Sequence, residues 1–118
     1  MLIRVDPQSA VPLFTQIAAA VRGEITSGRL AAGERLPAAR DVAGALEVNL
    51  HTVLHAYQDL RDEGLVDLRR GRGAVVTPAG AALGGLRAEI AALVDKSRAL
   101  GVSPDTLSAL VKEAARDH

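Results

Sequence analysis

Apolar residues recur along this chain at intervals that predict helices over most of its length. The first stripe is spaced by four residues, which aligns its members along one face of a helix. It consists of Leu13, Ile17, Val21 and Ile25. Pro12 suits the first turn of this helix and Gly28 its end. Ahead of it, the weak alternation of residues 2–5 predicts a short strand.

A short second helix and a longer third helix follow, separated by a tight turn at Glu47-Val48. The second helix is predicted over residues 38–46. Its inward side chains are expected to be Val42, Ala45 and Leu46. Asn49 is a favourable N-cap for the third helix, which is predicted to run from Leu50 to about Glu63. The apolar stripe of the third helix is Val53, Ala56, Tyr57 and Leu60.

Two short β-prone runs, residues 65–68 and 74–77, flank a glycine-containing turn and predict a β-hairpin. Gly64 ends the third helix just before the first run. The turn holds the only dense cluster of one charge sign in the chain. Its sequence is Arg69-Arg70-Gly71-Arg72-Gly73. Pro78 and Gly80 then mark a break in regular structure.

The last part of the chain has a heptad-like apolar seam followed by a second helical stripe. The seam comprises Leu86, Ile90, Leu93, Ser97 and Leu100. Ser103 and Pro104 predict the start of a final helix, and its stripe is Leu107, Leu110, Val111 and Ala114. Two helices cannot bury both apolar faces by themselves. They need either the first domain of the same chain or a second chain to cover them. We favour a second chain, and therefore expect residues 1–78 to form one domain and residues 79–118 to form a homodimerisation region.

Composition narrows the functional classes. Fourteen basic and fourteen acidic residues give zero formal net charge, so general attraction to DNA or membranes is weak. Aromatic residues make up 2% of the chain, which argues against base-stacking platforms. The absence of cysteine excludes disulfides and cysteine-based zinc sites. No apolar run is long enough to span a membrane and no apolar signal segment is present, so a cytoplasmic location without a membrane partner is expected.

The order helix, short helix, tight turn, helix, hairpin is that of a winged helix-turn-helix. The expected fold class is therefore mainly α with one small β-hairpin, an α+β winged unit followed by two C-terminal helices. In such a unit the start of the third helix enters the major groove, and the hairpin tip contacts the adjacent backbone or minor groove. The Gly-Arg-Gly turn lacks the lysine and the following helix of a phosphate-binding loop, which disfavours a nucleotide cradle.

His51 and His55 are four residues apart on the third helix, a spacing that can bind a metal ion. Nearby acidic residues continue down the helix away from this pair, so we favour groove-facing or solvated histidines and expect no metal and no cofactor. No Ser-His-Asp arrangement is present either, which argues against an enzyme. Tyr57 is expected to pack behind the third helix rather than to contact DNA.

Residues 12–76 resemble, from end to end, the DNA-binding domain of GntR-family bacterial transcription regulators. The landmarks that carry this resemblance occur in order along the chain. They include Pro12-Leu13-Phe14, Leu36-Pro37, Arg40, Val48-Asn49, Thr52-Val53, Ala56-Tyr57, Gly64-Leu65-Val66 and Arg70-Gly71-Arg72-Gly73. With only two short helices behind this segment, the chain is similar to the YtrA-type subfamily, whereas other subfamilies carry a much larger effector domain.

The resemblance implies that three segments contact DNA: the second helix, the start of the third helix and the hairpin tip, or wing. The implied residues are Arg40, then Asn49, His51, Thr52 and His55, and then Arg70, Gly71, Arg72 and Gly73. The chemistry agrees with these roles. Arginine is the commonest partner of guanine and favours narrow minor grooves, and glycine lets the backbone approach closely.

The sequence departs from the family pattern on this same surface. Ala38 stands where many members have serine, which removes a helix cap or a phosphate contact. Glu47 replaces a common glycine, which strains the turn and adds negative charge near DNA. Leu50-His51 stand where the subfamily often has Pro-Asn, and His55 stands where arginine is common. These changes bear on operator sequence and affinity rather than on the fold.

Together these features predict a homodimeric, sequence-specific regulator of double-stranded operator DNA, acting as a repressor of its own operon or of a transporter operon. The alternative is a winged helix that binds a protein instead of DNA, which the departures and the neutral charge would favour. A small-molecule effector could fit between the C-terminal helices and the DNA-binding domain and change the spacing of the third helices. The sequence names neither that effector nor the operator.

Overall fold

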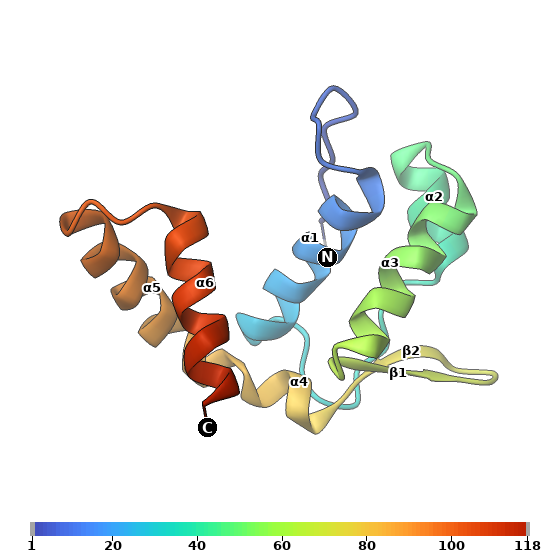
Figure 1. Ribbon diagram of the computed structural model, residues 1–118. Helices are drawn as coiled ribbons and strands as arrows, with labels where there is room; N and C mark the ends of the chain where they lie inside the picture. Colours follow the sequence, from blue (N-terminus) through green and yellow to red (C-terminus); the bar gives the residue numbers. More distant parts are fainter. Residues whose placement is uncertain (1, 118) are drawn as a thin grey trace. The chain divides into compact units, whose positions relative to one another are not determined.

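The computed structural model describes residues 2–117, and the chain divides between Gly84 and Gly85 into two compact units. The first unit contains three helices, a two-stranded hairpin and a short fourth helix (Figure 1). Their bounds are α1 Leu13–Thr26, α2 Ala39–Leu46, α3 Leu50–Asp62, β1 Val66–Arg69, β2 Gly73–Val76 and α4 Pro78–Ala82. The second unit is built from α5, Gly84–Ala99, and α6, Pro104–Arg116. The predicted fold class, mainly α with a small hairpin, is confirmed.

The core of the first unit lies between its helices and the hairpin, and both predicted long stripes point into it. The fully buried side chains of α1 are Ile17, Val21 and Ile25. The buried side chains of α3 are Val53, Ala56, Tyr57 and Leu60. Because each large apolar side chain stabilises the fold by about 1.5–3 kcal/mol when buried, these two stripes hold α1 and α3 together.

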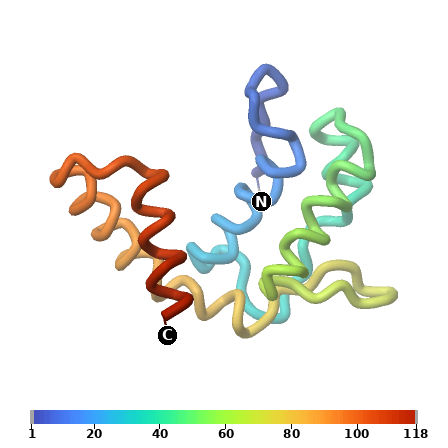
Figure 2. The backbone as a smooth tube through the Cα atoms, viewed as in Figure 1, coloured from blue at the N-terminus to red at the C-terminus, as the bar shows by residue number. Residues whose placement is uncertain are grey.

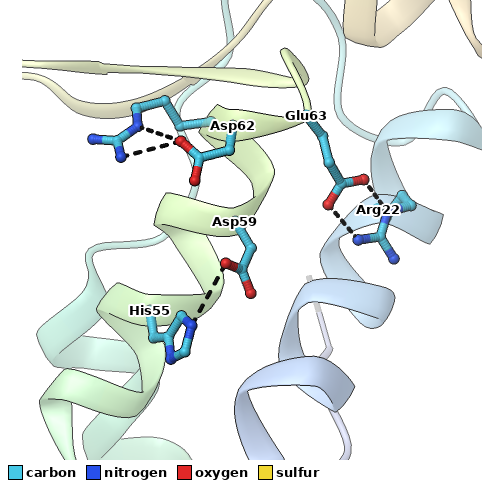
Figure 3. A network of polar contacts seen from close by, with 6 residues as sticks. Arg22, His55, Asp59, Asp62 and Glu63 are labelled. Atoms are coloured by element: carbon cyan, nitrogen blue, oxygen red, sulfur yellow. Dashed lines mark hydrogen bonds and ion pairs between the residues drawn. The ribbon is translucent and has the colours of Figure 1, made fainter.

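An ion pair joins the same two helices at the surface. The guanidinium of Arg22 in α1 donates from Nε to Glu63 Oε1 at 2.9 Å and from Nη2 to Glu63 Oε2 at 2.6 Å (Figure 3). Such bidentate pairing fixes orientation, but exposed pairs contribute only about 0.2–1 kcal/mol. The pair therefore orients the C-terminal end of α3 against α1 more than it stabilises the fold.

The hairpin is anchored at its base and stands free at its tip. β1 and β2 pair antiparallel, with Val66 opposite Val76. The connector between α1 and α2 runs beside β2, where the backbone N–H groups of Gly33 and Leu36 each donate to a β2 carbonyl at 2.8 Å. Figure 2 traces the hairpin as a projection whose tip lies away from the helices of the first unit. The wing is thus fixed to the core through one end only.

The segment after the hairpin is helical, so the predicted break is wrong. Thr77 caps α4, its Oγ1 accepting a hydrogen bond from the Gly80 N–H at 2.9 Å. Pro78 fits the first turn because its missing N–H needs no partner there. Gly80 is buried, and a Cβ at this position would lie 2.6 Å from the Leu65 carbonyl oxygen. The two residues expected to break regular structure therefore belong to a short helix, and Gly80 lets this helix lie against the backbone of Leu65 just before β1.

Two further expectations are also wrong. Residues 2–5 form no strand; Ile3 and Val5 instead pack half-buried against the core. On α2 the inward side chain next to Val42 is Ala43, whereas Ala45 is exposed. The helical period explains the second difference, because Ala43 shares a face with the neighbouring inward residues of α2.

In the second unit, α5 and α6 are joined by a tight connection with a well-formed cap at each side. Gly101, with φ of 76°, ends α5, and the Val102 N–H donates to the Ser97 carbonyl at 2.9 Å. Ser103 caps α6 by accepting from the Thr106 N–H at 3.2 Å, and Pro104 occupies its first turn. The predicted start of the last helix is therefore confirmed. Within the described residues, every helix falls short of the length and apolarity that a membrane span requires.

Candidate nucleic-acid interface

The turn between α2 and α3 determines where the start of α3 points. Glu47 adopts the left-handed conformation, with φ of 56° and ψ of 45°. The Val48 N–H then donates to the Ala43 carbonyl at 3.0 Å, so the chain reverses within two residues. Asn49 caps α3, its Oδ1 accepting from the His51 N–H at 2.8 Å. The predicted tight turn and N-cap are confirmed.

The first turns of α3 present both polar and apolar side chains to solvent. His51 is exposed and Thr52 is half-buried. Leu50 and Leu54 are 36% and 37% exposed, and their spacing of four residues places them on one face. Sequence reasoning treated Leu50 only as a departure from the family and did not single out Leu54. The signal was present: these leucines fall outside the buried stripe of an amphipathic helix.

His55 is turned toward α1. Its ring stacks on Phe14, with ring centroids 3.8 Å apart and planes 12° from parallel. Its Nε2 lies 3.6 Å from Asp59 Oδ1, one helical turn further along α3 (Figure 3). Phe14 had been identified only as a family landmark, so this contact was missed by sequence reasoning. The imidazole of His55 is therefore already engaged within the fold, unlike that of His51.

The tip of the wing is a glycine-flanked turn that carries two arginines. Gly71 and Gly73 have φ values of 80° and 75°, which favour glycine over any other residue. The Arg72 N–H closes the turn by donating to the Arg69 carbonyl at 3.0 Å. Within residues 2–117 the side chains of Arg70 and Arg72 have no acidic partner at ion-pair distance. Both positive charges are thus available to an external anion.

The other arginines near the wing differ in their surroundings. Arg69 lies 3.5 Å from the carboxylate of Asp67 on the same strand, so part of its charge is neutralised locally. Arg40 is exposed near the start of α2. Ala38 occupies the N-cap of that helix and supplies no side-chain hydrogen bond, as its departure from the family pattern predicted.

An open hollow of about 990 Å³ lies between the wing, the start of α2 and α3. Leu54 of α3 and Leu68 of β1 contribute apolar surface to it, and Leu68 is 40% exposed. The side chains of Arg69, Arg70 and Arg72 line its wing side. In Figure 1 the wing tip and the start of α3 project on the same side of the first unit. The lining therefore combines exposed leucines with several arginines and one carboxylate, that of Asp41.

Tyr57 lies on the side of α3 that faces the core, which confirms the prediction that it packs behind the DNA-facing surface of this helix. It is buried, and its hydroxyl donates to the Pro37 carbonyl at 2.7 Å. Burial raises the pKa of the Tyr57 hydroxyl from 10.0 to about 12, because the charged phenolate would lose its hydration. The residue thus ties α3 to the segment that precedes α2.

In the second unit, both helices expose large apolar side chains. On α5 these are Leu86, Ile90 and Leu93, and on α6 they are Leu110 and Val111. Leu107 is half-buried, and α6 has no fully buried residue among those described. Leu100 lies just beyond the end of α5, and Ser97, the buried member of the predicted seam, donates from Oγ to the Val94 carbonyl at 2.9 Å.

A model of the family described as bacterial regulatory proteins, gntR family, matches residues 13–76. The match runs from the start of α1 to the end of β2, which is more than half of the chain. It therefore covers the helix-turn-helix and the wing together.

Relatives and solved structures agree with this match. HTH-type transcriptional repressor YtrA of Bacillus subtilis is 33% identical over 76 residues, which span 64% of this chain and 58% of that protein. HTH-type transcriptional regulator Rv1152 of Mycobacterium tuberculosis is 36% identical over 104 residues, spanning 86% of this chain and 84% of that protein. The solved structure of YtrA from Sulfolobus acidocaldarius, a GntR-family transcription factor, superposes with a TM-score of 0.62 at 31% identity over 84% of this chain and 99% of that one.

These similarities confirm the predicted class, a transcription regulator rather than an enzyme. They also confirm the predicted subfamily, since the similar proteins include a YtrA from each of two organisms. The chain belongs to the gntR family of bacterial regulatory proteins and is a transcription regulator of the YtrA type.

Proposed function

We propose that this protein is a homodimeric repressor that binds double-stranded operator DNA in a sequence-specific manner. The observation that carries the proposal is the wing tip. Arg70 and Arg72 stand there without an acidic partner among the described residues, on the same side of the first unit as the capped start of α3. In a chain of zero net charge, cations placed in this way fit the phosphates beside a major groove that receives α3.

The predicted contact residues differ in which groups remain available to contact DNA. His51 and Thr52 present ring nitrogens and a hydroxyl from the start of α3. Asn49 uses its Oδ1 for the cap, which leaves its amide NH₂ as a donor. Arg40 approaches the backbone from α2, and Gly71 lets the wing come close to DNA. His55 contributes through its exposed edge, because its face rests on Phe14.

Residues 79–118 are proposed to form the dimer contact. The apolar side chains that α5 and α6 expose offer the surface that a second copy would cover. The predicted contact set is Leu86, Ile90, Leu93, Leu100, Leu107, Leu110 and Val111. A two-fold dimer places two copies of α3 in successive major grooves and therefore requires a palindromic operator.

The name of the Bacillus subtilis relative, a transcriptional repressor, supports repression as the role. Occlusion of the promoter is the mode of repression that we propose. The subfamily resemblance points to the protein's own operon or to a transporter operon as the target. A small-molecule effector that changed the spacing of the two α3 helices would release the operator, because both half-sites must be engaged together.

Footprinting on the DNA upstream of the protein's own gene tests this proposal. We expect protection of two inverted half-sites whose centres lie about 10–10.5 base pairs, or a multiple of that, apart. Arg72→Ala should weaken protection, whereas the same change at Arg29, which pairs with Glu24 at 2.9 Å, should leave it unchanged. Absence of protection on this DNA at low salt would favour the alternative, a winged helix that binds a protein.

A further inference from the structure

The part of α3 proposed to enter the major groove carries no arginine or lysine. The single arginine of the whole helix, Arg61, lies in the last turn of α3 and pairs with Asp62 at 3.2 Å. Bidentate arginine or lysine is the commonest reader of guanine, so direct reading of guanine by that pairing is not available to this half of the helix. The solvent-facing residues there must recognise other features of the base pairs.

Two leucines take the place of such cations. Leu50 and Leu54, 36% and 37% exposed, lie one helical turn apart on the same face of α3. Leu54 also lines the hollow that faces the wing. Single exposed leucines are ordinary in proteins. Here two of them are neighbours at the start of α3, where DNA is proposed to bind, and they form a continuous apolar strip.

The surroundings of this strip identify its occupant. Arg70 and Arg72, which have no acidic partner among the described residues, line the same hollow as Leu54, with one carboxylate, that of Asp41, near the start of α2. A ligand that fits must combine apolar groups with dense negative charge. In the major groove of DNA, the C5-methyl group of thymine is an apolar group that base edges offer, and phosphates flank it on both sides.

We propose that Leu50 and Leu54 read thymine methyl groups, so that this regulator selects T·A pairs at the positions that α3 covers. The inference rests on the proposed function, DNA binding through α3. Residues four apart are separated by about 6 Å along a helix axis. Bases on one strand are stacked about 3.4 Å apart. The two leucines therefore match thymines about two steps apart, and each half-site is expected to contain such a pair.

Replacement of thymine by uracil in the operator tests the inference, because uracil lacks only the C5-methyl group. Affinity should fall about fourfold per methyl removed from the α3 positions, the ratio that corresponds to about 0.8 kcal/mol per buried methylene. Uracil at flanking positions that α3 does not cover should leave the affinity unchanged.

Variants of the leucines assign the effect to them. Leu54→Ala should bind thymine and uracil operators equally at its position, and Leu50→Ala should do so at the other. Leu54→Met keeps an apolar side chain of similar volume and should retain most of the preference. Leu2→Ala removes a leucine that is 71% exposed and lies outside α3, so it should behave as the unmodified protein does. Circular dichroism would verify that each variant is folded.

The outcomes separate the two claims. An unmodified protein that binds both operators with equal affinity overturns the inference and leaves DNA binding through α3 intact. A thymine preference that persists unchanged in both alanine variants also overturns it, because the methyl groups would then be read elsewhere. If the protein shows no preference for its operator over unrelated DNA at any salt concentration, the proposed function fails first and the inference with it.

Discussion

Glu47 is the only residue other than glycine with positive φ in the described part of the chain. A left-handed conformation costs a side-chain-bearing residue roughly 1–2 kcal/mol, and at this turn the cost is borne just before α3 begins. The same carboxylate adds negative charge beside the surface proposed to meet phosphates. This residue therefore opposes both the stability of the turn and the affinity for DNA.

We expect Glu47→Gly to raise the free energy of unfolding by about 1 kcal/mol, because glycine adopts the left-handed conformation without steric cost. It should also tighten operator binding. Glu47→Gln is the matched control: it removes the charge and keeps the strain, so it should tighten binding without stabilising the fold. Urea unfolding and DNA titration of both variants measure the two effects. Equal stability of the Gly and Gln variants would contradict the account of strain.

Tyr57 makes the fold sensitive to alkaline pH. Its pKa is about 12 in the folded chain against an ordinary 10.0, so its contribution to stability is complete below pH 10 and is lost as the pH rises through about 12. Tyr57→Phe should lose this dependence and, at neutral pH, about 1 kcal/mol from the missing bond to Pro37. Urea unfolding at neutral pH and at pH values between 10 and 12 would show the two stabilities converging. If the free energy of unfolding changed with pH in the same way for both proteins, the alkaline sensitivity could not be assigned to Tyr57.

At the scale of elements, α2 begins without the usual support. Its N-cap residue, Ala38, has no side-chain group to accept a hydrogen bond from the first N–H groups of the helix. Ala38→Ser should therefore stabilise the first unit by about 1 kcal/mol, measured by thermal or urea unfolding. Ala38→Gly, which adds no hydroxyl, is the control and should give a smaller gain than serine does. A serine variant no more stable than the glycine variant would contradict this reading of the helix start.

The elements that were predictable from sequence are those with a long apolar stripe or a distinctive cap. The stripes of α1 and α3, the turn at Glu47, the Asn49 cap and the hairpin all follow from local patterns. The absence of a strand at residues 2–5 did not follow, because a strand requires a partner and the pattern says nothing of one. The helix α4 could not be predicted locally, because proline and glycine commonly end regular structure. The reason for glycine at position 80 is the nearby carbonyl of Leu65, a contact that the local sequence does not reveal.

In the candidate site, too, local sequence predicts some features, whereas others depend on contacts between distant residues. Local sequence located the wing arginines, since the glycines that shape the turn are adjacent to them. The stack of His55 on Phe14 joins residues 41 positions apart, which no helical period reports. The exposed strip of Leu50 and Leu54 lies outside the buried stripe of α3, so the pattern that marks the core does not point to it as part of the site.

At the scale of the whole molecule, the proposal depends on two copies of the chain acting together. Ile90 is 57% exposed on α5, within the predicted contact set. Ile90→Asp should convert the dimer to a monomer, because a carboxylate would be buried at the contact without a partner. Asp95→Asn is the control, since that position lies about 140° around the helix from Ile90.

Sedimentation would give the mass of each variant. The Ile90 variant should sediment as a monomer and bind a single half-site as well as a full operator, since the second half-site adds affinity only through the dimer. A dimeric mass for Ile90→Asp, or a monomeric mass for the unmodified protein, would refute the proposed contact.

The salt dependence of operator affinity tests the central claim, that the wing and its arginines bind DNA, most directly. If Arg40, Arg70 and Arg72 of both copies each neutralise a phosphate, log K should fall against log salt with a slope of about −5, a loss of about 10³ between roughly 50 and 200 mM salt. Arg72→Ala should reduce the slope to about −3.5, since each copy loses one phosphate contact. A slope that is the same for Arg72→Ala and for the unmodified protein would contradict the claim.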